Sequence, residues 1–237
     1  MSLLLTLCLM FAPPSAAELV ERSIQYHDPQ DRWGSTAVEL VAVVELAPRL
    51  ASERGYAKRT DRLQFDLKNE IFSVESSRGE QTFRISSKAG GYSASLNGST
   101  EIDAERREEL GLQPDRLPRW HHYFEYMFGL PMKLRDPGTR MDPTVKTVSF
   151  GGSEVWAVRV TYDPDVGSDV WDFFFDPQNA SLVGCRFFHD ETKNDGEYIA
   201  FSEEIVGSGG LRLPKVRSWH MNADGEWIAN DQIESLN

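Results

Sequence analysis

Cysteine is scarce in this chain of 237 residues, which contains only Cys8 and Cys185. The N-terminal segment that holds Cys8 has the features of a removable export signal, as described below. Its removal would leave one thiol, so no intrachain disulfide could form. A single cysteine inside a predicted strand is typical of a small buried apolar residue rather than a nucleophile. The sequence therefore indicates neither a disulfide-stapled scaffold nor cysteine catalysis.

Basic side chains are in the minority, since 25 Lys and Arg stand against 37 Asp and Glu, for a net charge of −12. Such a chain is a poor candidate for binding nucleic acid or an anionic membrane surface. A transmembrane helix needs about 20 apolar residues in a row, and no apolar run of this sequence is that long. A Gly-rich phosphate loop, a nucleophile elbow and a CxxC pair are absent as well. We expect no nucleic-acid partner, no transmembrane span, no metal and no cofactor.

The first seventeen residues carry no charged side chain. A short apolar run, Leu3–Ala12, is followed by two prolines and three small residues, which is the layout of a secretory signal cleaved after Ala17. The usual basic start of such a signal is missing, and the alternative is an N-terminal helix kept in the mature protein. The sequence predicts a signal peptide at 1–17 and a single exported domain at 18–237, periplasmic or extracellular.

The hydrophobic pattern changes character twice along the domain. Short alternating segments typical of strands fill residues 38–96 and resume from about residue 145 to the C-terminus. Between them, residues 103–129 are rich in helix formers and are interrupted by Gly111 and Pro118. Strands and helices do not alternate one by one. This order predicts an α+β fold, in which one large curved antiparallel sheet forms an open half-barrel around a short helical insert.

The most informative strands are the aromatic pair in "SDVWDFFFDPQNASLVGCRFFHDE", Ser168–Glu191. A turn over "PQNA" would place Phe175 opposite Leu182, Phe173 opposite Gly184 and Trp171 opposite Arg186. One face would then carry Trp171, Phe173, Phe175, Leu182 and Phe188. The other face would carry Val170, Phe174, Val183, Cys185 and Phe187.

Both faces of this predicted hairpin are apolar, whereas a sheet with water on one side alternates apolar and polar residues. The few helices can cover one face. A second sheet layer, a partner subunit or a bound apolar ligand could cover the other, and an ordinary filled core without a cavity fits the pattern equally well.

Three stretches of the second half carry a family resemblance. They are "GLPMKLRDPG", the aromatic hairpin and "GLRLPKVRSWHMNADGEW", all between Gly129 and Asp231. Together they resemble a family of exported bacterial proteins of unknown function, in which the stretch matched by Leu130–Pro137 is shared. The predicted layout also resembles the unclosed β-barrel of the periplasmic lipoprotein-localisation carriers. That resemblance implies a concave aromatic cavity for acyl chains, and no residue pattern here singles out lipoproteins as cargo.

We therefore expect an exported, non-catalytic binding protein that carries or chaperones a lipid, an acyl chain or a lipoprotein in an apolar cavity. The expected ligand-contacting residues are Trp156, Trp171, Phe173 and Phe175 as the lining, with Phe124 and Met127 as a lid.

Two other functions stay open. His121 and Glu125 are four residues apart on one helix face, so they could serve as an acid–base pair or as two metal ligands of a hydrolase or isomerase. A third ligand would have to come from a distant histidine, and the simpler interpretation is a surface contact. The second alternative is an envelope interaction module without a small ligand, whose apolar face meets a partner subunit.

Two charged features complete the set of candidates. Lys133 and Arg135 are the one compact basic spot near the predicted cavity; they could meet an anionic head group or simply stabilise a helix C-terminus. The acidic loops Asp163–Asp169, Asp190–Gly196 and Asn222–Gly225 should lie at one end of the sheet. They could form a cation-binding rim or be three solvated turns.

Overall fold

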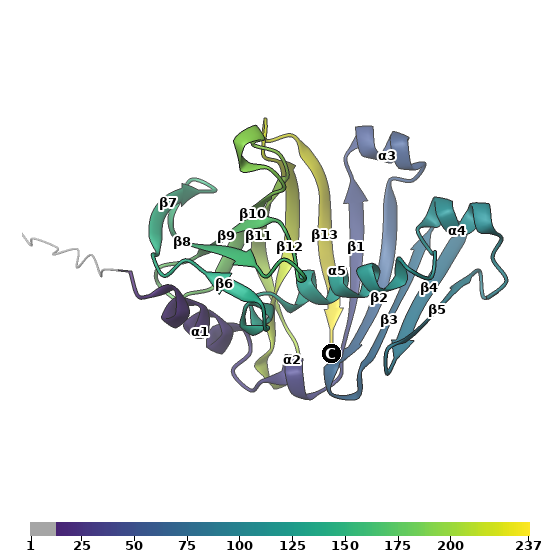
Figure 1. The fold of residues 1–237 in the computed structure, drawn as a ribbon, viewed down its shortest axis with the longest axis horizontal. Helices are drawn as coiled ribbons and strands as arrows, with labels where there is room; N and C mark the ends of the chain where they lie inside the picture. The colour runs from purple at the N-terminus through teal and green to yellow at the C-terminus, as the bar shows by residue number, and fades with distance from the viewer. Residues whose placement is uncertain (1–12) are drawn as a thin grey trace, which may run out of the picture.

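The computed structural model describes residues 13–237, whose strands form one open, strongly curved sheet (Figure 1). The strand order is β5-β4-β3-β2-β1-β13-β12-β11-β10-β9-β8-β6, with β7 also paired to β8 and every pair antiparallel. The strands are β1 (Val38–Leu46), β2 (Lys58–Asp66), β3 (Ile71–Arg78), β4 (Gln81–Lys88), β5 (Gly91–Leu96), β6 (Thr139–Met141), β7 (Lys146–Phe150), β8 (Ser153–Tyr162), β9 (Val170–Phe175), β10 (Leu182–Phe188), β11 (Glu197–Val206), β12 (Arg212–Met221) and β13 (Trp227–Leu236).

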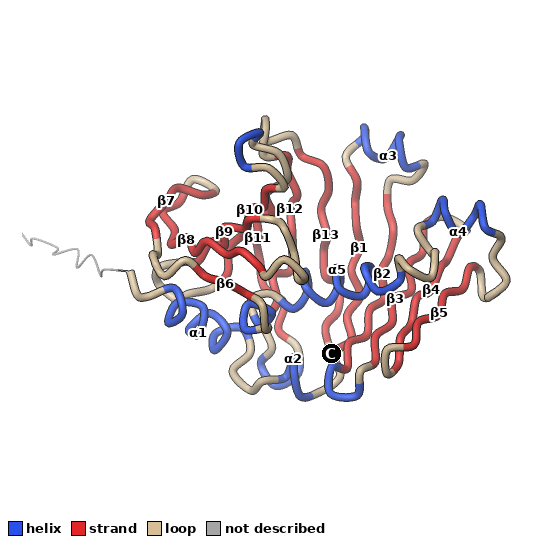
Figure 2. The backbone as a smooth tube through the Cα atoms, in the orientation of Figure 1, coloured by secondary structure: helices blue, strands red, loops and turns tan. Residues whose placement is uncertain are grey.

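Helices lie on the concave side and at the rim of this sheet (Figure 2). They are α1 (Ala16–His27), α2 (Arg32–Ser35), α3 (Pro48–Arg54), α4 (Ala104–Leu110) and α5 (Leu117–Gly129), and a 3-10 turn, η2 (Met132–Arg135), follows α5. The long helix α5 crosses the front of the sheet (Figure 1). This architecture confirms the predicted α+β class, with a large curved antiparallel sheet that stays open and surrounds helices. Among the described helices, none combines the length and the hydropathy that a membrane span requires.

Helix α1 begins with a complete capping box. The Ser15 hydroxyl accepts a hydrogen bond from the Glu18 amide (3.4 Å), and the Glu18 carboxylate accepts one from the Ser15 amide (3.0 Å). Its buried stripe, Leu19, Val20 and Ile24, packs into the core. The apolar run predicted as the signal core lies outside the described residues, and the predicted cleavage point after Ala17 falls in the first turn of α1.

Helix α5 buries Phe124, Met127 and Phe128 against the concave face. Pro118 stands in its first turn, where the missing amide hydrogen costs no intrahelical bond. The helix ends at Gly129, where a Cβ atom would lie 2.7 Å from the Trp33 ring. Glycine is therefore required for the close approach of α2 to the end of α5.

The predicted register of the aromatic hairpin is right only at its first pair. Phe175 faces Leu182, but a β-bulge between Leu182 and Gly184 then shifts the pairing by one residue, so that Phe173 faces Cys185 and Trp171 faces Phe187. Cys185 and Phe187 consequently join the main core rather than the opposite face. An extra residue in one strand moves every later side chain of that strand to the other face of the sheet. The pattern of residue types does not indicate this bulge.

The convex face of this hairpin is covered by the neighbouring strand β7. The Phe150 ring stacks on Phe174 with centroids 4.2 Å apart, and Val148 and Val183 pack around them. Gly184 leaves the space for Phe150, since a Cβ there would lie 2.6 Å from Phe150 Cζ and 2.7 Å from the Ile199 carbonyl oxygen. The β7–β8 hairpin at the edge of the same sheet thus covers the convex apolar face. This cover differs from the second sheet layer, the partner subunit and the bound ligand considered from the sequence.

Candidate functional site

Two open clefts lie beside α5. The first, which we call the arginine cleft, is about 560 Å³ and lies between α3, α4, α5 and strands β2 to β4. The second, the aromatic cleft, is about 870 Å³ and lies between α5, η2 and the β8–β9 loop. Arg119 and Tyr123 line both clefts, so the two are adjacent. We refer to them together as the trough.

Arginines dominate the charge of the arginine cleft. Its lining includes five arginines and two glutamates, in a protein whose net charge is −12. The arginines are Arg54, Arg59, Arg78, Arg116 and Arg119, and the glutamates are Glu108 and Glu109 of α4. Aromatic and leucine side chains supply most of the remaining surface: Leu46, Leu50, Tyr56, Phe83, Leu110, Trp120 and Tyr123. The cleft is thus both cationic and partly apolar.

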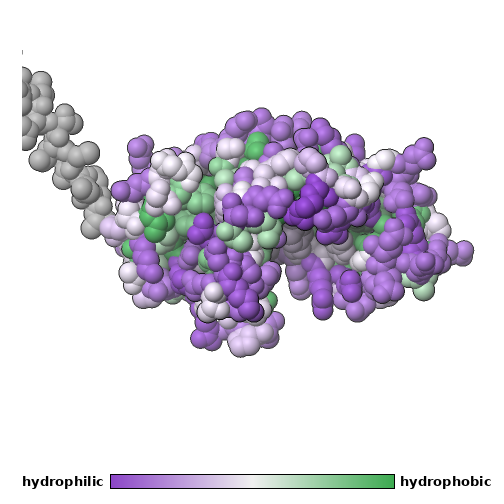
Figure 3. All heavy atoms as spheres, turned by 90° about the horizontal axis from the view of Figure 1, so that it is seen from above, coloured by the Kyte–Doolittle hydropathy of each residue, from purple (hydrophilic) through white to green (hydrophobic). Residues whose placement is uncertain are grey.

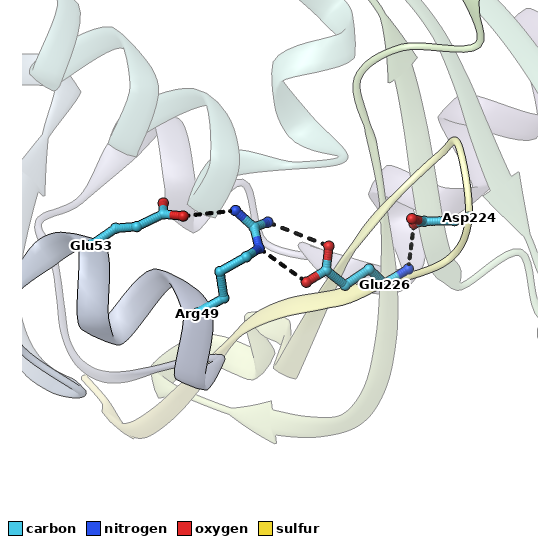
Figure 4. A network of polar contacts seen from close by, with 4 residues as sticks. All are labelled: Arg49, Glu53, Asp224 and Glu226. Carbon is cyan, nitrogen blue, oxygen red and sulfur yellow. Dashed lines mark hydrogen bonds and ion pairs between the residues drawn. The ribbon is translucent and has the colours of Figure 1, made fainter.

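Helix α3 forms one edge of this cleft through Leu50 and Arg54. Arg49 of the same helix donates hydrogen bonds to Glu53 (3.0 Å) and to Glu226 of the β12–β13 turn (3.1 and 3.4 Å), as Figure 4 shows. The Glu226 amide in turn donates to Asp224 (2.9 Å). This exposed network ties α3 to the β12–β13 turn, beside the end of β13 that pairs with β1. Seen from above, most of the surface is hydrophilic, with hydrophobic patches between (Figure 3).

A belt of buried polar side chains crosses the sheet near the floor of the trough. Arg217 of β12 stands directly opposite Asp231 of β13, and Asp231 accepts a hydrogen bond from the Trp219 indole nitrogen (3.0 Å). On β2, Arg59 donates to Asp61 (2.9 Å). Burial raises the pKa of the Asp231 carboxyl and lowers the pKa of Arg217 to about 10. Arg59 is thus paired with a carboxylate of its own strand, whereas Arg217 only stands opposite one on the neighbouring strand.

Three members of this region keep buried polar atoms without a hydrogen-bond partner among residues 13–237. They are Asp61 Oδ1, Ser76 Oγ, and Arg217 Nε and Nη1, in side chains that are each 1% exposed. Ser76 also lines the arginine cleft. Unpaired buried polar atoms are costly in a folded protein and call for a physical explanation.

The aromatic cleft is walled by Tyr126, Tyr162 and Trp171. The hydroxyls of Tyr126 and Tyr162 are hydrogen-bonded to each other, and the Trp171 ring packs edge-on to Tyr126 at 5.4 Å. Burial raises the pKa of both phenols above the ordinary value, so both stay protonated at neutral pH. This wall offers flat aromatic surface with a neutral polar edge.

His121 and Glu125 meet at the boundary of the aromatic cleft, in the geometry expected from their spacing. The His121 Nε2 to Glu125 Oε2 distance is 3.0 Å, and His121 Nδ1 lies 2.8 Å from the Tyr92 hydroxyl. Lys133 of η2 pairs with both Glu125 and Asp136. Although burial opposes ionisation, the hydrogen bonds from His121 and Lys133 lower the pKa of Glu125 to about 2. Glu125 is therefore a paired carboxylate that joins α5 to η2.

The distant histidines do not complete a metal site with this pair. His27 is buried between the Arg212 carbonyl (2.8 Å) and the Leu182 amide (3.0 Å), and His189 pairs with Asp169. Across residues 13–237, no group of three or more His, Cys, Asp or Glu side chains has a metal-binding arrangement. The chemistry open to His121 and Glu125 is proton transfer or structural pairing.

The six side chains predicted to contact a ligand have two different environments. Trp171 lines the aromatic cleft. The other five are buried in the main core: Phe124 and Met127 on α5, Trp156 on β8, and Phe173 and Phe175 on β9. Their contact with a ligand stays a prediction, and in the present arrangement it requires the core around them to open.

The predicted charged features are compensated locally. Lys133 pairs with Glu125 and Asp136, and Arg135 pairs with Glu21 of α1. In the acidic loops, ion pairs join Asp163 to Arg140, Asp169 to His189, Asp190 to Lys193 and Glu191 to Arg159. The cationic site was missed because its arginines lie on separate elements between residues 54 and 119 and come together only through the strand register and the packing of α5.

Solved structures with the same arrangement exist. A domain described as an outer membrane lipoprotein-sorting protein, from Vibrio parahaemolyticus, aligns with a TM-score of 0.52 at 10% identity, covering 92% of this chain and 90% of that one. A DUF1329 family protein from Desulfovibrio piger aligns with a TM-score of 0.52 at 8% identity, covering 93% and 92%. These likenesses concern the fold. The comparison with curated proteins found no match. Over residues 3–235 the chain matches, and therefore belongs to, the family of unknown function DUF6503.

Proposed function

We propose that this protein is an exported, non-catalytic binding protein that carries a lipid, an acyl chain or a lipoprotein. The observation that supports the proposal is the trough on the concave side of the open sheet. It has arginines at one end and, at the other, the rings of Tyr126, Tyr162 and Trp171 among paired charged side chains. An amphiphile presents these two complementary chemistries, an anionic head and an apolar chain. The likeness in fold to a domain described as lipoprotein-sorting is consistent with such a role.

Ligand binding would begin on side chains that are already accessible. Tyr123, Tyr126 and Trp171 line the open surface along α5. Phe124 and Met127 belong to α5 and are buried on its core-facing side. In this proposal α5 acts as a lid: an acyl chain that displaces it would gain contact with Trp156, Phe173 and Phe175. Burial of apolar surface, at roughly 25 cal/mol per Å², is the driving force.

Tryptophan quenching tests the proposal. Dodecanoate brominated at its terminal carbon should quench the Trp171 fluorescence, and Trp171→Phe should remove a large part of that quenching. Trp227→Phe is the matched control, because Trp227 lines neither cleft of the trough. Absence of quenching in a protein whose circular dichroism shows an intact sheet would contradict the carrier role.

A second candidate is supported by the hydrogen-bonded series Tyr92–His121–Glu125 beside the aromatic cleft, which has the partners of a general acid–base group. An esterase or isomerase could use it. Hydrolysis of p-nitrophenyl dodecanoate by the wild type, and its loss in His121→Gln, would favour this enzyme over the carrier.

A further inference from the structure

We propose that the arginine cleft is a specific site for an anionic head group, a phosphate or a carboxylate, with Arg78 as its central contact. The anion site itself is argued from the residues of the cleft. That the anion carries an apolar chain rests on the proposed carrier function. It specifies which end of an amphiphile enters which end of the trough.

The guanidinium of Arg78 is held in place by aromatic rings. Its Cζ atom lies 5.0 Å from the centroid of the Tyr56 ring and 5.5 Å from that of the Phe83 ring. Among residues 13–237, no carboxylate lies within 4 Å of it in an ion pair. Stacking of this kind positions the guanidinium while leaving its N–H donors free for another acceptor. Arg78 thus has the fixed orientation and the unused donors that an anion site requires.

The surrounding cations reinforce this position. Arg54, Arg116 and Arg119 line the same cleft, and within the described chain none of them forms an ion pair. Arg59, by contrast, is paired with Asp61, which raises the pKa of Arg59 although its burial acts in the opposite direction. Of the two glutamates at the rim, Glu109 is paired with Arg106. An excess of positive charge therefore remains inside the cleft.

Ser76 provides an independent indication of a ligand. Its side chain is 1% exposed and lines the cleft, and its hydroxyl has no hydrogen-bond partner among the described residues. A bound oxyanion would accept a hydrogen bond from this hydroxyl and satisfy it. Charge-assisted hydrogen bonds of this type are the strong ones, and arginine forks match phosphate and carboxylate geometry.

The direction of the attached chain follows from the shared lining residues. Tyr123 and Arg119 belong to both clefts, so a chain leaving the arginine cleft along α5 passes Tyr123 and reaches Tyr126 and Trp171. A linear amphiphile would therefore lie along α5 with its head group beside α3 and α4.

The test uses the full chain and probes that share a 12-carbon tail. Dodecyl phosphate, dodecanoate and neutral dodecyl maltoside are titrated by isothermal calorimetry, with inorganic phosphate as the tail-free probe. We expect both anionic amphiphiles to bind at least about tenfold more tightly than the maltoside. Arg78→Gln should weaken the binding of both anionic amphiphiles about tenfold, because one charge-assisted hydrogen bond is lost. The affinity for the maltoside should not change.

Two further variants keep the test decisive. Arg116→Gln, at the exposed start of α5, should also weaken the binding of both anionic amphiphiles. It replaces Arg78→Gln as the test if that variant does not fold. Arg84→Gln is the matched control, since Arg84 lies on β4 but lines a different surface, beside Glu75 and Arg62. It should bind all probes like the wild type.

The outcomes separate the head-group site from the carrier function. Equal binding of the three tailed probes, unaffected by Arg78→Gln, would overturn the anion site and leave the carrier role standing. Binding of inorganic phosphate as tight as that of dodecyl phosphate, and lost in Arg78→Gln, would support the anion site and contradict an amphiphile as the ligand. Failure of every probe to bind would overturn both.

Discussion

The guanidinium of Arg217 lies 4.3 Å from the centroid of the Phe128 ring, so a buried charge of the sheet contacts the underside of α5. Within residues 13–237, two donor atoms of Arg217 have no hydrogen-bond partner, and its directly opposed neighbour is Asp231. Desolvation of such ions offsets much of their mutual attraction. We infer that the polar belt holds α5 less firmly than a fully apolar contact would, in line with the lid role proposed above.

The pair Arg217–Asp231 should show strong coupling in a double-mutant cycle. Arg217→Leu removes one of the two cations that act on the buried Asp231 carboxylate, the other being Arg59, and we expect a loss of about 3 kcal/mol in the free energy of unfolding. Arg217→Leu combined with Asp231→Leu should cost clearly less than the sum of the two single changes. Urea denaturation measures all three. Additive losses would show that the two side chains do not act as a pair.

The cover of the convex face can be tested at Gly184. Gly184→Ala places a methyl group against the Phe150 ring and the Ile199 carbonyl, and overpacking of this kind costs about 1–3 kcal/mol. Phe150→Leu should weaken the effect of Gly184→Ala, because the smaller side chain makes room. Thermal unfolding of the single and double variants decides. If Gly184→Ala is as stable as the wild type, β7 does not lie on this face.

His27 should make stability depend on pH. Burial lowers the pKa of His27 in the folded protein below the ordinary 6.5, so both states are neutral above that value and the full stability is present there. As the pH falls below 6.5, the unfolded chain takes up a proton that the folded one does not. Stability then falls, by up to about 1.4 kcal/mol per pH unit, until the folded pKa is reached.

The measurement compares urea unfolding of the wild type and His27→Gln between about pH 7.5 and about pH 5.5. The variant should be less stable at the upper pH, since it loses the bridge between Arg212 and Leu182, and its pH slope should be shallower. Parallel slopes would mean that His27 is not buried in its neutral form.

Glu125 should contribute stability that acid removes. Its folded pKa is about 2 and its ordinary value is 4.5, so the contribution is present above 4.5 and is lost as the pH falls towards 2. Glu125→Gln should cost about 2 kcal/mol at neutral pH, after allowance for solvent screening, and progressively less below pH 4.5. Glu80→Gln, at an exposed turn, is the control and should cost little at any pH. A pH-independent cost for Glu125→Gln would contradict the hydrogen bonds that Glu125 accepts from His121 and Lys133.

The fold class could be predicted because alternating apolar residues and helix formers report local geometry directly. The strand face of Val38, Leu40 and Ala42 is buried as its period of two requires. The register of the aromatic hairpin could not be predicted, because the bulge after Leu182 leaves no mark in the pattern of residue types. Phe187, expected on the face opposite Trp171 and Phe173, is in the main core with them for that reason.

The candidate site was predicted only in part. His121 and Glu125 are neighbours on one helix, so their contact follows from their spacing. Arg54, Arg78 and Arg116 come from three separate elements, and their convergence depends on the curvature of the sheet and the placement of α5. Long-range convergence of this kind is a property of the packed structure and not of any local stretch.

Native mass spectrometry of the protein purified from its producing cells without detergent tests the central claim most directly. We predict a stoichiometric adduct that is released on denaturation as an anionic molecule with an acyl chain, and a clear loss of that adduct in Arg78→Gln but not in Arg84→Gln. A folded protein that carries no such adduct, and that takes none up when incubated with dodecyl phosphate or dodecanoate, would contradict the account.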